Sequence, residues 1–243
     1  MINGSDGTQF PPGSVTSHSR LYLFLTQLCR SIYMIYDTEV QLNGIKALKF
    51  TVPATVFLNG SDYPENKAFC PYECYTTGIL DTSGCQSNSE TAIPFKMRSP
   101  ILVSAPHFYH GDPKLVEAVN GLKPVAALHE TFFSVEPHTG IPIDGAMRLQ
   151  LNAHIQPVED IKQTECLQEV ILPIMYFSGE AKINSVKTKL MKDKILGPLS
   201  VVYSAEYVAI GIGTFLLLVA LVLSVISCLK NRQTAEEKTP LVK

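Results

Sequence analysis

The stretch Tyr207–Leu229 constrains this chain most, because its 23 positions carry no charged residue between Glu206 and Lys230. An α-helix of this length rises about 34 Å, enough to cross the hydrocarbon layer of a membrane with some tilt. The run is apolar on every face, which is typical of a helix surrounded by lipid. The alternative is a buried helix of a large soluble protein, and uncharged runs this long are rare there.

The flanks of this stretch predict its orientation. Tyr203 and Tyr207 lie where an interfacial aromatic belt is expected, and Lys230 and Arg232 follow the run directly. The positive-inside rule therefore places the C-terminus in the cytosol. We expect an exterior domain over residues 1–204, a membrane helix over 205–229 and a cytosolic tail over 230–243.

The N-terminal residues contain no apolar signal segment, since the chain opens Met1-Ile2-Asn3-Gly4-Ser5-Asp6-Gly7. Either the final helix directs the exterior part across the membrane late, or the sequence is the C-terminal part of a longer protein. The second interpretation is favoured. The formal net charge of −2 offers no basic stripe for nucleic acid, so nucleic acid is not an expected partner.

Alternating apolar and polar residues predict a mainly β exterior domain with a few helices. Asn43-Gly44 lies between two such runs and predicts a hairpin. In the run Ile141–Ile155, Met147, Leu149, Leu151 and Ala153 alternate with Arg148, Gln150, Asn152 and His154, so we expect one dry face and one wet face. Further strands are expected at Ser31–Tyr36, Ile101–Ser104, Glu130–Glu136 and Glu169–Phe177, with Pro173 marking an edge or a bulge.

Two helices are predicted outside the membrane stretch. Lys114–Asn120 follows Asp112-Pro113 and precedes Gly121, the usual signals for the two ends of a short helix. Ile183–Leu196 is basic and leads into the membrane stretch.

Five cysteines lie in the predicted exterior part, and an oxidising compartment allows disulfides there. Cys70 and Cys74 could form half a zinc site, but a small disulfide loop is favoured outside the cell. Asn3 and Asn59 each begin a glycosylation sequon, which fits the secretory pathway.

No motif supports catalysis or metal binding. His107 and His110 are three residues apart, a spacing seen in zinc sites, but a metal needs further ligands and structural histidines are favoured. We find no phosphate loop, nucleophile elbow or His-Glu-x-x-His motif. We therefore expect neither enzymatic activity nor a cofactor.

Two short features lie at the cytosolic end of the sequence. Cys228 is a candidate palmitoylation site, with an unmodified thiol as the alternative. Glu237, Leu241 and Val242 resemble an acidic dileucine sorting signal.

Several motifs occur along the chain in a characteristic order: Met1–Gly7 with Phe10-Pro11-Pro12, Cys29-Arg30-Ser31, Ser104–Tyr109, Gly121–Pro124, His129-Glu130 and Glu136–Gly140. Their order and spacing resemble the class B scavenger receptors through nearly the whole chain. The segment Phe57–Ser61 with Phe69-Cys70-Pro71 looks most like the high-density-lipoprotein receptor branch, while the tail Lys238–Val242 looks more like the lysosomal integral membrane branch.

The resemblance implies a glycosylated exterior domain, folded as a distorted antiparallel β-barrel with an apolar tunnel, of which this chain holds the C-terminal half. It suggests the disulfides Cys29–Cys85 and Cys70–Cys74 and leaves Cys166 without an assigned partner. Gln86–Pro100 is longer than the corresponding link of the family.

The implied function is a cell-surface receptor that binds lipoproteins and passes cholesterol, cholesteryl ester or fatty acids through the tunnel to the membrane. The candidate tunnel-wall residues are Met147, Leu149, Leu151, Ala153, Val170 and Leu172. Ordinary core packing is the alternative for each of them. A lysosomal trafficking receptor for a protein ligand and a non-functional fragment are the alternative functions, and a homo-oligomer stays open.

Overall fold

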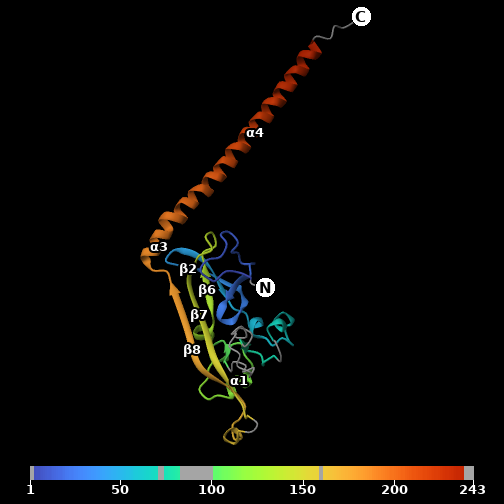
Figure 1. The fold of residues 1–243 in the computed structure, drawn as a ribbon. Helices are drawn as coiled ribbons and strands as arrows, with labels where there is room; N and C mark the ends of the chain where they lie inside the picture. The colour runs from blue at the N-terminus through green and yellow to red at the C-terminus, as the bar shows by residue number, and fades with distance from the viewer. Residues whose placement is uncertain (1–2, 71–73, 83–100, 159–160, 238–243) are drawn as a thin grey trace, which may run out of the picture. The chain divides into compact units, whose positions relative to one another are not determined.

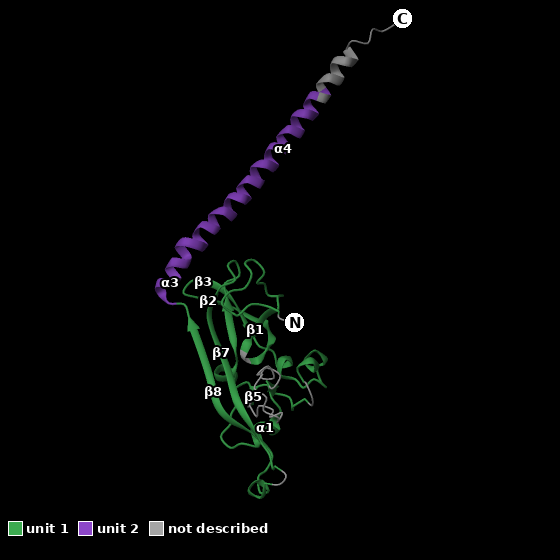
Figure 2. Cartoon of the chain, in the orientation of Figure 1, with its two compact units in different colours: residues 1–183 green, residues 184–243 purple. Residues whose placement is uncertain are grey.

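The computed structural model describes residues 3–70, 74–82, 101–158 and 161–237. The chain divides into two compact units, residues 1–183 and residues 184–243 (Figure 2). Contacts within a chain do not locate a membrane, so the expected division into 1–204, 205–229 and 230–243 stays a prediction. Cys85, Gln86–Pro100, Leu241 and Val242 lie outside the described residues.

The first unit is built on an antiparallel sheet of eight strands, in the order β1-β2-β3-β6-β7-β5-β4, with β8 paired to β7 (Figure 1). The sheet does not close on itself within the described residues. The antiparallel sheet and the long apolar helix predicted from the sequence are confirmed. The strands are β1 Leu21–Leu25, β2 Arg30–Leu42, β3 Ile45–Thr51, β4 Leu80–Asp81, β5 Ile101–Ser104, β6 Phe132–Val135, β7 Pro142–Ile155 and β8 Val170–Lys182.

The hairpin between β2 and β3 turns at Asn43-Gly44, as predicted. Asn43 has φ 49 and Gly44 has φ 75, so both central residues adopt the left-handed region. Turns of this kind match the right-handed twist of the flanking strands, which explains why Asn-Gly is favoured there.

Strand β7 holds the sheet together because it is paired along both edges. On one edge of β7, strand β6 pairs with the first part of β7 and strand β5 with the last part. On the other edge, β8 pairs with β7 from Asp144↔Lys182 to Ile155↔Val170. In Figure 1, β6, β7 and β8 lie next to one another. The register between β7 and β8 shifts after Leu151, where Ile174 is an extra residue beside Pro173. The bulge predicted at Pro173 is therefore present, on a strand that pairs only with β7 among the described residues.

The helices of the first unit are short. Helix α1, Pro113–Glu117, is capped by the Asp112 carboxylate, which accepts a hydrogen bond of 2.9 Å from the Lys114 backbone N–H. It ends before the predicted Asn120. Helix α2 covers Ala126–His129, and the 3₁₀ turns are η1 Thr26–Leu28, η2 Ala54–Phe57, η3 Pro64–Phe69, η5 Pro106–Phe108 and η6 Lys162–Thr164.

The main core lies on one side of the sheet. It joins buried side chains of β1, β2 and β3 with Val56 and Phe57 of η2 and Phe10 of the N-terminal segment. Leu23, Met34 and Phe50 are fully buried in it. Burying apolar surface supplies most of the favourable free energy of folding, about 25 cal/mol per Å², so this cluster is the main stabilising element of the first unit.

The second unit is helical from Ser185 to Glu237. Helix α3, Ser185–Met191, is capped by Asn184, whose side-chain oxygen accepts a 2.8 Å hydrogen bond from the Lys187 N–H. A π-helical turn η7, Lys192–Leu196, leads into α4, Gly197–Glu237. The helical run Ser185–Ser227, which ends within α4, is the one among the described residues that is long and apolar enough to cross a membrane.

The turn between β6 and β7 is fixed by a buried carboxylate. Glu136 is 2 % exposed and accepts hydrogen bonds from the backbone N–H groups of His138 and Thr139, at 3.0 and 2.7 Å. The turn ends at Gly140, with φ 70, whose carbonyl accepts from the Phe10 N–H at 2.8 Å. A side chain on Gly140 would overlap the Phe10 carbonyl.

We predict that Gly140→Ala destabilises the protein more than Gly121→Ala. Both glycines have positive φ, so alanine costs about 1–2 kcal/mol at either position. A Cβ at Gly121 meets nothing within 4 Å, whereas a Cβ at Gly140 meets the Phe10 backbone. Thermal unfolding of the detergent-solubilised chain checks this, and equal melting temperatures would contradict it.

Candidate functional site

The six candidate wall residues lie on one face of the sheet, which we call the apolar face. Met147, Leu149, Leu151 and Ala153 alternate along β7 and therefore share a face. Val170 is paired with Ile155 and Leu172 with Ala153, and directly paired residues point to the same side of a sheet. Six residues from two strands thus form one apolar surface.

The apolar face continues along β8 beyond the residues that the sequence predicted. Leu151 is paired with Met175 and Leu149 with Phe177, so both partners point to the same side as the six. Their side chains are about half exposed. They were missed because the bulge at Ile174 shifts the alternation by one position, from Val170 and Leu172 before it to Met175 and Phe177 after it. Pro173 was the signal in the sequence that could have revealed the shift.

On β7 the apolar face is joined to the main core. Met147, Leu149 and Leu151 are half-buried and pack against that cluster. Met147 and Leu149 also line a cavity of about 20 Å³. This space suits about one water molecule and is far too small for an acyl chain. The other lining residues are Leu23, Leu25, Leu28, Ile32, Val52, Val56, Phe57, Leu80 and Thr131.

The opposite face of β7 is not wet, and our expectation of a solvated face was wrong. Gln150 and Asn152 are 2 % and 1 % exposed, because η5 and β5 cover them. The Gln150 amide donates to Asn152 Oδ1 at 2.8 Å, and Asn152 Nδ2 donates to Ser104 Oγ at 3.0 Å. Buried polar groups are stable only when they are hydrogen-bonded, and this chain of amides meets that requirement.

Arg148 is buried on the same polar face. Its guanidinium donates to the carbonyl oxygens of Ala127 and Glu130 at 3.1 and 3.0 Å, and to the Glu180 carboxylate at 2.9 Å. The bond from Arg148 lowers the pKa of Glu180. One arginine therefore connects the segment around α2 with β7 and β8.

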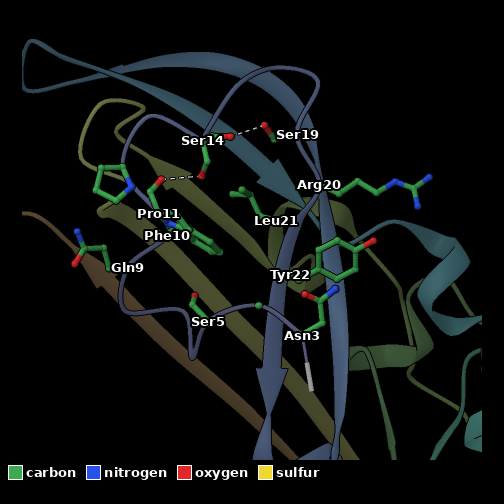
Figure 3. A pocket seen from close by; sticks show the side chains of 12 residues that line it. Asn3, Ser5, Gln9, Phe10, Pro11, Ser14, Ser19, Arg20, Leu21 and Tyr22 are labelled. Carbon is green, nitrogen blue, oxygen red and sulfur yellow. Dashed lines mark hydrogen bonds between the residues drawn. The ribbon is translucent and has the colours of Figure 1, made fainter. Parts of the chain in front are cut away.

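A separate groove lies beside β1, at the edge of the sheet (Figure 3). It has a volume of about 860 Å³ and none of the six wall residues lines it. Phe10 and Leu21 form a buried apolar floor, and the exposed side chains of Asn3 and Arg20 lie along its rim. Residues 3–12 border the groove, held to β1 by the Ser5 N–H, which donates to Tyr22 O at 3.1 Å.

The comparisons with known proteins place the chain in a family. The CD36 family model matches residues 1–224. The chain belongs to the CD36 family. It is 35 % identical to bovine "Scavenger receptor class B member 1" over 222 residues, 91 % of this chain and 41 % of that protein. It is 31 % identical to human "Lysosome membrane protein 2" over 249 residues, 100 % of this chain and 48 % of that protein. The chain therefore spans less than half the length of these relatives.

The cysteines of this CD36-family chain are placed as follows. Cys70 and Cys74 form a disulfide. Cys29 is disulfide-bonded, and since Cys85 lies outside the described residues the pairing Cys29–Cys85 stays a prediction. Cys166 is exposed and free in the part of the chain that is described. Cys228 lies within α4.

The two glycosylation sequons differ in exposure. Asn3 is exposed, and its backbone N–H donates to Ser31 Oγ at 2.9 Å. Asn59 is half-buried, with Nδ2 donating to the Tyr75 carbonyl at 2.8 Å. Asn3 is therefore the acceptor more freely presented to solvent, and glycosylation of both stays a prediction.

His107 and His110 do not converge on a metal. Within the described ranges no group of three or more His, Cys, Asp or Glu side chains could hold one. His107 stacks on His129 instead, with ring centroids 4.3 Å apart, and His110 stacks on Phe57. Glu237, the first residue of the predicted sorting signal, is the last residue of α4.

We predict that Arg148→Lys destabilises the chain by about 2 kcal/mol or more, because an ammonium cannot bridge two carbonyls and a carboxylate in fork geometry. Arg20→Lys is the matched control, since Arg20 is exposed and should stay within about 0.5 kcal/mol of wild type. Chemical denaturation of both variants measures the difference. Equal stabilities would show that the bonds of Arg148 contribute little.

Proposed function

We propose that this CD36-family chain is the C-terminal part of a cell-surface receptor that binds lipoproteins and lipids and passes cholesterol, cholesteryl ester or fatty acids to the membrane. The observation that carries the proposal is the apolar face of β7 and β8, which joins the main core at one side and is half exposed at the other. Family membership and the match to scavenger receptor class B member 1 support it.

The physical basis of the proposal is the cost of hydrating a hydrocarbon chain. Each CH₂ group moved from an apolar surface into water costs about 0.8 kcal/mol. A lipid that slides along side chains such as Leu172, Met175 and Phe177 avoids part of that cost. Met147 and Leu149 pack against the main core and would form the rigid part of the surface along which the lipid moves. The polar face of β7 contributes indirectly, since its hydrogen bonds hold the strand in register.

The half-exposed part of the apolar face supports a path along the surface of β8. The cavity beside Met147 and Leu149 is too small to hold a lipid, so a ligand would lie along the surface of β8 rather than inside the main core. The chain spans 41 % and 48 % of these two relatives, and we propose that the wall facing β8 is supplied by sequence that the relatives have in addition.

The test is a bulky substitution on the apolar face. In cells expressing the full-length receptor to which we propose this chain belongs, Ala153→Phe should reduce uptake of labelled cholesteryl ester at least about fivefold, since overpacking a fitted apolar surface costs about 1–3 kcal/mol. Surface expression, measured by antibody labelling, should be unchanged.

The matched control is Ala118→Phe, the same substitution at an exposed alanine after α1. It should leave uptake at the wild-type level. Wild-type uptake by a normally expressed Ala153→Phe variant would contradict the proposal, and so would an equal loss in both variants.

The second proposal is a trafficking receptor that carries a protein ligand to lysosomes. The observation that favours it is the match to lysosome membrane protein 2, which extends over the entire chain, whereas the match to scavenger receptor class B member 1 covers 91 %. The additional coverage can include the tail with its predicted sorting signal at Glu237, Leu241 and Val242.

Leu241→Ala should move the chain from lysosomes to the cell surface if the tail is read as a sorting signal. Lys243→Ala is the control, because it changes the same tail outside the predicted signal. Fluorescence microscopy against lysosomal and surface markers distinguishes the outcomes. A steady-state distribution unchanged by Leu241→Ala would remove the basis of this second proposal.

A further inference from the structure

The segment of residues 122–130, which we call the strap, is held to the sheet by side chains rather than by strand pairing. Its residues from Lys123 to Leu128 are exposed and its buried anchor is His129, at 6 % exposure. Arg148 binds the carbonyls of Ala127 and Glu130, as described above. The Tyr176 hydroxyl donates to the Leu128 carbonyl at 3.4 Å.

Two histidines accept backbone hydrogen bonds of the strap. The Lys123 N–H donates to Nδ1 of His107 at 2.9 Å, which ties the strap to η5. The Val125 N–H donates to Nδ1 of His129 at 2.9 Å, a bond within the strap that holds the turn of α2. A backbone N–H can only donate, so each Nδ1 must be an unprotonated acceptor. Protonation would put a hydrogen on that nitrogen, and each bond exists only while its imidazole is neutral.

The two imidazoles are also stacked on each other. Their planes are 13° apart and their centroids 4.3 Å apart. Two protonated rings at this distance would repel each other. They would do so beside Arg148, a permanent cation that cannot lose its proton.

We infer that residues 122–130 form an acid-sensitive strap, which is closed while His129 is neutral and opens when this buried ring gains a proton beside Arg148. No property of the proposed lipid path is needed for this inference. Release would also free Arg148 from two of its acceptors, since the Ala127 and Glu130 carbonyls belong to the strap.

The pKa of His129 supports the direction of the effect. Burial, His107 and Arg148 together lower the pKa of His129 below its usual range. The closed state therefore binds fewer protons than a state in which this ring is in water. Lowering the pH through the ordinary histidine value of about 6.5 favours the open state, and raising it favours the closed state.

The acidic residue of the strap acts in the opposite direction to His129. Burial raises the pKa of Glu130, so its protonation in acid favours the closed state; its carboxylate lies 3.6 Å from Lys49 Nζ. Burial also lowers the pKa of His110, so a second ring near the strap favours the neutral form. The charged and titratable groups of the surrounding elements are Asp37 of β2, Lys49 of β3, His107 of η5, Tyr109, His110, Arg148 of β7, Tyr176 and Glu180 of β8, and Lys123 and Glu130 of the strap.

The test is hydrogen exchange on the full chain in detergent at pH 7.5 and pH 5.0, expressed as protection factors to remove the intrinsic pH dependence of exchange. A single imidazole released at a pKa of about 6.5 favours the open state by up to about 30-fold at pH 5. We therefore expect protection of the Lys123 and Val125 amides to fall about tenfold or more at pH 5.0. Amides of β7 between Met147 and Ala153 should keep their protection.

The matched variants are His107→Asn and His129→Asn. Asparagine places an oxygen acceptor near the position of Nδ1 but does not titrate, so the strap should stay protected at both pH values. Equal strap protection in the wild-type chain at both pH values would overturn the inference without any variant. A fall in strap protection at pH 5.0 that is as large in a variant carrying both substitutions as in the wild-type chain would also overturn the inference.

Discussion

The structure depends on one strand that is hydrogen-bonded along both of its edges. Strand β7 pairs with β6 and β5 on one side and with β8 on the other, so it decides which side chains of four strands share a face. A shift of one residue would move every side chain of β8 to the other side of the sheet. The bulge at Ile174 therefore determines the composition of the apolar face, because it places Met175 and Phe177 on the same face as Val170 and Leu172.

The two faces of β7 have different roles. The apolar face continues from the main core to half-exposed side chains on β8, which is the property a surface for lipid needs. The polar face is buried and holds two sets of hydrogen bonds. The amides of Gln150 and Asn152 bond to each other and to Ser104, and the Arg148 guanidinium donates to the Ala127 and Glu130 carbonyls. Directional hydrogen bonds of this kind specify a register better than apolar packing does, because an unsatisfied buried polar group costs about 1–3 kcal/mol. The polar face thus maintains the alignment on which the apolar face depends.

Much of the fold could be predicted from local patterns. The hairpin at Asn43-Gly44, strand Ile101–Ser104 and the long apolar helix depend on short-range signals of turn chemistry, alternation and length. The burial of Gln150 and Asn152 could not be predicted, because alternation shows that two faces differ and does not show what covers each of them. Met175 and Phe177 were missed because one extra residue reverses the alternation. The His107–His129 stack joins positions 22 residues apart, and no short-range sequence pattern predicts such a contact.

The proposed function requires that lipid touches the apolar face of β7 and β8. Photo-crosslinking with a diazirine-bearing cholesterol, followed by mass spectrometric mapping of the labelled peptides, measures this contact on the membrane-embedded chain. We expect label on side chains of the apolar face, including Leu172, Met175 and Phe177, in addition to label on α4. Label confined to α4, or shared equally with residues of the polar face of β7, would show that this face is not a lipid surface.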